Sequence, residues 1–176
     1  MSQVKRYVQV GLGGRASLFT HAAAFQYPDH ATLVGLCDSN TGRARLAAAD
    51  VQHRTGRDTP VYAHTDFDRM LQEVRPDTVI VTTTDAHPDD YICRALEAGC
   101  DAITEKPMTT DAAKCQRILD IQRRTGRAVR VTFNYRYAPP RTQVKDLLMK
   151  GTIGEVLSVD FHWMLDTYHG ADYYRR

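Results

Sequence analysis

A glycine-rich segment near the N-terminus has the residue types and spacing of a phosphate-binding turn. It follows a short apolar run over 7–10, precedes a helical pattern, and reads Gly11-Leu12-Gly13-Gly14-Arg15-Ala16. Gly11 permits a tight turn, Gly13 lets a pyrophosphate approach the backbone, and the small Ala16 lets helix and strand pack closely. The start of the helix offers N–H groups to the phosphates. Ordinary turns also contain glycines, but this strand–turn–helix context predicts a dinucleotide site.

An acidic residue follows the second apolar run, which covers 31–37. This residue is Asp38, and Ser39 comes next. A carboxylate there accepts hydrogen bonds from ribose hydroxyls and repels a 2′-phosphate, so we expect NAD as the cofactor. NADP stays possible, because Arg43 is near enough to hold a 2′-phosphate. Asp38 could also cap the helix that begins near Asn40.

Hydroxyl groups and an imidazole follow the fourth apolar run, over 78–82. Thr82 and Thr83 could contact the nicotinamide-side ribose and the phosphates, and His87 could contact a ligand. In open α/β sheets, ligands bind at this carboxyl edge. An equally good interpretation is that the threonines cap the next helix and that His87 is solvated.

The triplet Glu105-Lys106-Pro107 follows the fifth run, over 101–104. Partial desolvation and a nearby cationic nicotinamide ring would both favour the neutral amine of Lys106, as a proton shuttle requires. Pro107 restricts the backbone so that Lys106 projects in one direction. Glu105 could orient or partly neutralise the lysine. An isolated loop lysine would simply be solvated.

These segments lie in a regular alternation of β-rich runs and amphipathic helical stretches. Further strands are expected at 61–62 and 129–133, and helices at 67–74, 88–98 and 110–126. The alternation predicts an α/β fold, a doubly wound parallel sheet of the Rossmann type, over residues 1–137. After the linker at 137–140, we expect residues 138–176 to begin a second α+β domain, with a helix to Gly151 and a strand over 155–163 that lacks partners. The chain is thus expected to be a fragment.

Composition excludes several other classes of protein. With 23 basic and 21 acidic residues interspersed, the sequence shows no nucleic-acid or membrane-surface patch. No apolar run reaches the roughly 20 residues that cross a bilayer. The four cysteines lack metal-ligand spacing, so no metal is expected. A reduced, cytoplasmic compartment fits best.

Taken together, the chain resembles the family of glucose–fructose oxidoreductase, inositol dehydrogenase and MocA over its whole length. The resemblance is carried by the glycine segment, Cys37-Asp38, the lysine triplet and Asn134-Tyr135-Arg136-Tyr137. It implies a Rossmann domain followed by a mostly antiparallel sheet domain that mediates homo-oligomers. It also implies that Lys106 is the catalytic lysine and that Asn134 and Arg136 lie near the nicotinamide and the substrate. Members of the family usually have Thr-Pro-Asn-x-x-His after the fourth strand. This chain keeps Thr82 and His87 but has Thr83 and Thr84 in place of the proline and the asparagine.

The resemblance implies hydride transfer between a nicotinamide cofactor and a carbinol carbon of a sugar, cyclitol or related polyol. The family's catalytic histidine lies farther along than this chain reaches, so the chain is expected to bind cofactor but to lack a complete active site. The segment 169–174 could line a substrate cleft or form a surface loop. Two alternatives remain: a non-catalytic dinucleotide sensor, which would not need Lys106, and a methyltransferase, which the glycine spacing disfavours.

Overall fold

The structure is a computed structural model that describes residues 4–164 and 167. The chain divides into two compact units, the first ending at Phe133 and the second beginning at Asn134. Each unit is described by itself.

The first unit is built on a six-stranded parallel sheet in the order β3-β2-β1-β4-β5-β6. The strands are β1 (Lys5–Val10), β2 (Ala31–Asp38), β3 (Val61–Ala63), β4 (Thr78–Val81), β5 (Asp101–Glu105) and β6 (Val129–Thr132). In β4 all four residues, Thr-Val-Ile-Val, are buried, as a strand covered on both faces requires. Strand order reverses between β1 and β4, the point where such sheets bind ligands. All six predicted strands are present, so the predicted Rossmann sheet is confirmed.

Local signals set the ends of the helices. The helical elements of this unit are α1 (Ala16–His21), continued by the π-helix η1 (Ala22–Gln26), α2 (Thr41–Thr55), the 3-10 helix η2 (His64–Asp66), α3 (Phe67–Val74), α4 (Pro88–Glu97) and α5 (Ala112–Thr125). The side chain of Asn40 caps α2 by accepting from the N–H of Gly42, and Asp111 caps α5 by accepting from Lys114. Gly56 and Gly126 end these two helices in the left-handed conformation.

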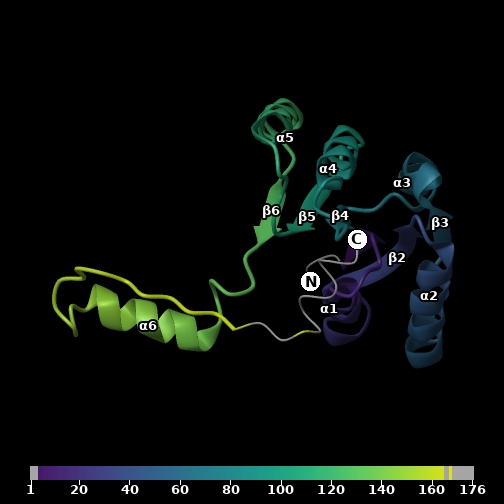
Figure 1. The fold of residues 1–176 in the computed structure, drawn as a ribbon. Helices are drawn as coiled ribbons and strands as arrows, with labels where there is room; N and C mark the ends of the chain where they lie inside the picture. Colours follow the sequence, from purple (N-terminus) through teal and green to yellow (C-terminus); the bar gives the residue numbers. More distant parts are fainter. Residues whose placement is uncertain (1–3, 165–166, 168–176) are drawn as a thin grey trace. The chain divides into compact units, whose positions relative to one another are not determined.

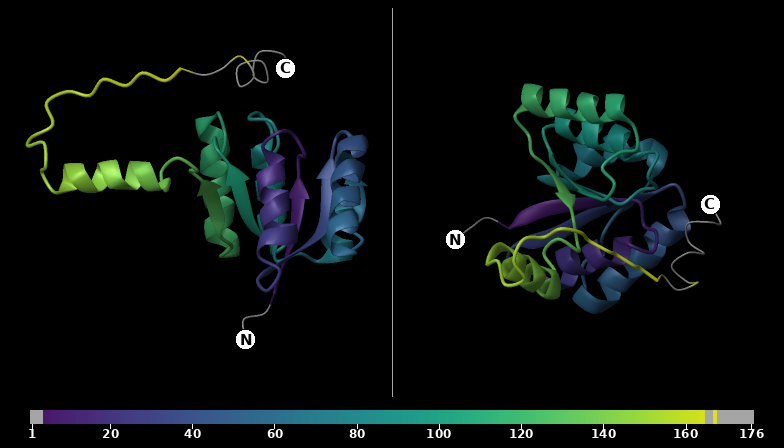
Figure 2. Two further views of the ribbon diagram at one scale, coloured as in Figure 1. Left: turned by 90° about the horizontal axis from the view of Figure 1, so that it is seen from below. Right: turned by 60° about the vertical axis from the view of Figure 1, so that its left-hand side comes forward.

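Helices cover the sheet on both faces. Figure 1 shows α3, α4 and α5 on one side and α1 and α2 on the other, and the right-hand view of Figure 2 shows the sheet between the two groups. Phe67, Ile92 and Ile118 pack against the sheet on the first side. Leu36 and Ile80 pack against α1 and α2 on the second. Two separate hydrophobic cores therefore hold the strand ends in place.

The second unit differs from its prediction in one element. Its helix, α6 (Pro139–Met149), is present, but residues 155–164 form no strand. Instead, Trp163 lies with its ring 5.1 Å from that of Tyr135, and the guanidinium of Arg141 lies over Tyr135. A strand needs a hydrogen-bonded neighbour, and no other strand occurs among the described residues of this unit. The prediction of a strand over 155–163 was therefore wrong.

Candidate cofactor-binding site

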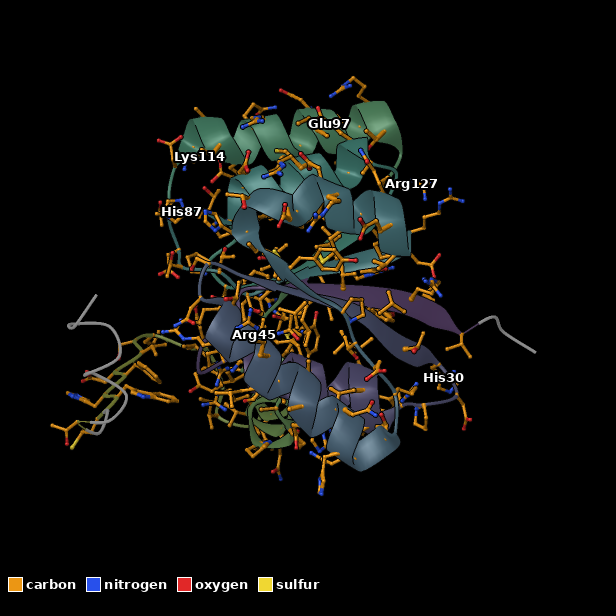
Figure 3. All side chains as sticks on the ribbon, turned by 90° about the vertical axis from the view of Figure 1, so that its right-hand side faces the viewer. His30, Arg45, His87, Glu97, Lys114 and Arg127 are labelled. Carbon is orange, nitrogen blue, oxygen red and sulfur yellow. The ribbon has the colours of Figure 1, made fainter. Side chains whose placement is uncertain are left out.

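The carboxyl edge of the sheet brings the predicted site residues of the first unit together. The glycine turn follows β1, Asp38 ends β2, Thr82 follows β4 and Glu105 ends β5. These four strands are consecutive in the sheet. Figure 3 shows His87 and Lys114 at this edge, and His30 and Arg127, which precede β2 and β6, at the opposite one.

The glycine turn is packed tightly against the end of β4. Gly11 has φ +85°, and a Cβ there would lie 2.6 Å from the carbonyl oxygen of Thr82. The N–H of Gly11 donates to Cys37 O at 2.9 Å. Only glycine fits this backbone at this distance. The turn then enters α1, whose start has no side-chain cap.

Asp38 joins the glycine turn to the loop after β2. Its carboxylate is 4% exposed and accepts from Leu12 N at 2.5 Å and from Asn40 N at 2.7 Å. The Ser39 hydroxyl lies 3.4 Å from the same carboxylate. Asn40 is the N-cap of α2, so Asp38 does not cap this helix. Its carboxylate instead links the glycine turn to the loop after β2. An anionic acceptor therefore stands at the position where a ribose is expected.

A cavity of about 240 Å³ opens beside the turn, between α1, η1 and α2. Leu12, Gly13 and Ala16 line it on one side and Arg43 on the other. Ser39 and Arg43 are both exposed. The structure thus places Arg43 next to the glycine turn, where it could meet a phosphate.

Thr82 and Thr83 differ in what their hydroxyls do. Thr82 Oγ1 donates to Gly11 O at 2.5 Å, so its hydrogen is used within the protein. Thr83 Oγ1 is buried and has no hydrogen-bond partner. His87 is exposed at the start of α4, where its N–H donates to Thr84 O and its side chain caps nothing. Thr83, rather than Thr82, therefore offers a free hydroxyl at this edge.

Glu105 contacts both the glycine turn and the backbone of Lys106. One carboxylate oxygen, Oε2, accepts from the backbone N–H of Lys106 at 2.9 Å. The other, Oε1, lies 3.6 Å from Arg15 Nη2 and, although buried, has no hydrogen-bond partner. Lys106 itself is exposed, and the bond between it and Pro107 is cis. The Glu105 carboxylate thus holds the backbone N–H of Lys106 at the end of β5.

These features fit a bound dinucleotide. Buried polar atoms almost always have partners. Thr83 Oγ1 and Glu105 Oε1, which follow β4 and end β5, have no hydrogen-bond partner and are therefore available to a ligand, although Thr59 Oγ1, before β3, is also without one. The tight turn at Gly11 and the anionic Asp38 complete the donor and acceptor pattern that a pyrophosphate and a ribose need.

Some predicted residues lie outside the first unit or outside the described residues. Asn134 and Arg136 lie in a turn at 134–137 of the second unit, so their roles stay predictions. The segment 169–174 lies outside the described residues. Within residues 4–164 and 167, no cluster of His, Cys, Asp or Glu could hold a metal, and no helix is long and apolar enough to cross a membrane.

Sequence reasoning missed one residue of the site, Gln9. It is fully buried behind the glycine turn and donates to Ala16 O and to Thr82 Oγ1. The available signal was a polar residue in the otherwise apolar run that leads into the turn.

The fold and this site define an NAD-binding Rossmann domain. Residues 5–133 match the oxidoreductase family with an NAD-binding Rossmann fold, the family of glucose–fructose oxidoreductase, inositol dehydrogenase and MocA. The chain belongs to this family, as its glycine segment and lysine triplet predicted.

Individual relatives agree with this assignment. The oxidoreductase YteT of Bacillus subtilis is 36% identical over 174 residues, which are 98% of this chain and 40% of YteT. Inositol 2-dehydrogenase of Salmonella typhimurium is 30% identical over 128 residues, which are 72% of this chain and 36% of that protein. The structure of the WlbA dehydrogenase of Bordetella pertussis with NADH and UDP-GlcNAcA is similar at a TM-score of 0.70 and 26% identity, covering 86% of this chain and 44% of that one. The chain therefore spans less than half the length of these relatives.

Proposed function

We propose that this protein is an NAD-dependent dehydrogenase that oxidises or reduces a carbinol carbon of a sugar, cyclitol or related polyol. The observation that supports this most is the position of Lys106. It follows β5, which is the neighbour of β4 in the sheet, and Glu105 contacts both its backbone N–H and Arg15 of the glycine turn. The substrates named for the relatives, an inositol and a sugar nucleotide, support the substrate class.

In this proposal each residue has a defined task at the carboxyl edge. The backbone of residues 11–16, including Gly14, holds the pyrophosphate, and Asp38 with Ser39 accepts hydrogen bonds from the adenosine ribose. Thr83 and His87 face the nicotinamide-side ribose. NAD⁺, when bound, accepts a hydride at C4 of its ring. If the cofactor were NADP, Arg43 would hold its 2′-phosphate.

Lys106 moves the proton in this scheme. As the carbinol carbon loses its hydride, the neutral amine of Lys106 takes the hydroxyl proton and the C–O bond becomes a carbonyl, so charge and atoms balance. The reverse direction returns the proton from the ammonium group. Glu105 keeps the Lys106 backbone in place through its hydrogen bond. Holding both reactants at one edge supplies rate through proximity, by several kcal/mol.

We further propose that residues 1–137 form the cofactor domain and that 138–176 begin a substrate domain, with Asn134 and Arg136 near the ring and the substrate. The matched part makes up less than half of these relatives, so we expect the present 176 residues to bind cofactor but to turn over polyols slowly. A homo-oligomer and a cytoplasmic location belong to the same proposal.

The substitution Lys106→Ala tests the reaction, in a protein extended to the length of the relatives. Turnover of inositols or sugars should fall at least about 100-fold while NADH affinity stays within about threefold, because the amine transfers a proton rather than holding the cofactor. Lys5→Ala, at the amino edge of β1, is the matched control and should change neither. Unchanged turnover would favour a dinucleotide sensor. Tighter binding of S-adenosylmethionine than of NAD⁺ would favour a methyltransferase.

A further inference from the structure

The side chain of Gln9 lies at the centre of a buried polar network beneath the glycine turn. Gln9 is 0% exposed on β1. Its Nε2 group donates to Ala16 O at 2.9 Å and to Thr82 Oγ1 at 3.1 Å. Its Oε1 atom accepts from the hydroxyl of Thr20 at 2.7 Å. One side chain therefore contacts the start of α1, its second turn and the end of β4.

The network determines the direction of the Thr82 hydroxyl. That group has one hydrogen, which goes to Gly11 O at 2.5 Å, while one of its lone pairs receives the amide of Gln9. Thr82 is thereby held between Gln9 and Gly11. The neighbouring Thr83 is left with its hydroxyl unpartnered.

We propose that Gln9 is a positioning residue for the cofactor. By fixing Thr82 against the glycine turn and the start of α1, it sets the spacing between the backbone that holds the pyrophosphate and the Thr83 hydroxyl. The inference rests on the proposed function, because it assumes that both loops bind one dinucleotide.

Loss of Gln9 should alter binding more than folding. After Gln9→Met, the Thr20 hydroxyl can still donate to Ala16 O, 3.2 Å away, and Thr82 still donates to Gly11 O. No buried donor loses its only acceptor, and methionine has a similar length. Removing a polar group without orphaning its partners is close to neutral for stability. What is lost is the restraint on Thr82.

The experiment titrates NAD⁺ and AMP against the 176-residue chain and against Gln9→Met, by calorimetry. The Kd for NAD⁺ should rise about tenfold, equivalent to about 1.4 kcal/mol. The Kd for AMP should change less than about twofold, because AMP reaches only the Asp38 side of the site and does not need the spacing to Thr83. Thr78→Val is the matched control: it removes another buried hydroxyl from the sheet, at the amino end of β4, and should leave both constants unchanged.

Each result separates the inference from the proposed function. Equal NAD⁺ affinity of Gln9→Met and the unchanged chain would overturn the positioning role and leave the dehydrogenase proposal intact. Equal losses of affinity for NAD⁺ and AMP would assign Gln9 to the core and overturn the positioning role. The same holds if circular dichroism shows that both Gln9→Met and Gln9→Leu are unfolded. Failure of the unchanged chain to bind NAD⁺ would overturn both proposals.

Discussion

The carboxylate of Asp38 accepts a hydrogen bond from the backbone N–H of Leu12, 26 positions earlier, at 2.5 Å. The same carboxylate accepts from Asn40 N, so a single buried anion fixes the glycine turn after β1 and the loop after β2. The residue expected to recognise a ribose therefore also shapes the turn expected to hold the pyrophosphate.

Asp38→Asn should weaken NADH binding about tenfold and reduce the preference over NADPH. An amide carries no charge to repel a 2′-phosphate, and it has one accepting oxygen in place of the two carboxylate oxygens that accept from Leu12 and Asn40. Fluorescence titration with both nucleotides measures the change. Asp120→Asn, on the exposed face of α5, serves as the control. An unchanged NADH to NADPH ratio would contradict the assigned role of Asp38.

Gly11→Ala should destabilise the first unit more than Gly56→Ala does. Both glycines have positive φ, which costs an alanine roughly 1–2 kcal/mol. Only Gly11 is also crowded, because its Cβ would lie 2.6 Å from Thr82 O, whereas the space around Gly56 is open. Overpacking adds roughly 1–3 kcal/mol. Urea denaturation gives the free energy of unfolding of both variants, and the difference between them measures the effect of the crowding at Gly11. Equal losses would show that the close approach at Gly11 does not constrain the turn.

The sheet could be predicted from the sequence because its signals are local. The β-branched run from Thr78 to Val81 favours a buried strand, Pro88 marks the start of a helix, and Gly126 marks the end of another. The strand expected over 155–163 is absent because strand formation depends on a partner rather than on its own residues. Likewise, no local signal reveals that Thr82 points inward to Gly11 while Thr83 does not.

Alkaline pH should destabilise the first unit through Cys37. Burial raises the pKa of its thiol from 9.0 to about 12, and the charge of Asp38 adds to the rise. The folded state therefore keeps a proton that the unfolded state loses above pH 9. This contribution to stability is fully present below pH 9 and is lost as the pH rises toward 12, by at most about 1.4 kcal/mol per pH unit. Cys37→Ala should flatten this part of the curve of unfolding free energy against pH. An identical slope in both proteins would contradict the burial of the thiol.

Lys114→Met should loosen the segment between β4 and α4. The Lys114 ammonium donates to Ala86 O at 2.9 Å and to the buried carboxylate of Asp89 at 3.0 Å. The lysine is partly exposed, so we expect a loss of only about 1 kcal/mol, together with faster amide exchange over 83–87. Arg123→Gln, which removes a fully surface pair with Asp120, should lose less than about 0.5 kcal/mol. Unchanged exchange over 83–87 in Lys114→Met would show that the pair does not hold this loop.

The central claim is that one dinucleotide lies along the carboxyl edge, with its pyrophosphate on the glycine turn and its nicotinamide facing Lys106. A crystal structure of the chain with NAD⁺ tests this most directly. We expect phosphate oxygens on the backbone N–H groups of residues 12–15 and the nicotinamide ring at the ends of β4 and β5, beside the Lys106 ammonium. Electron density for NAD⁺ away from the glycine turn, or with the nicotinamide remote from Lys106, would contradict the account.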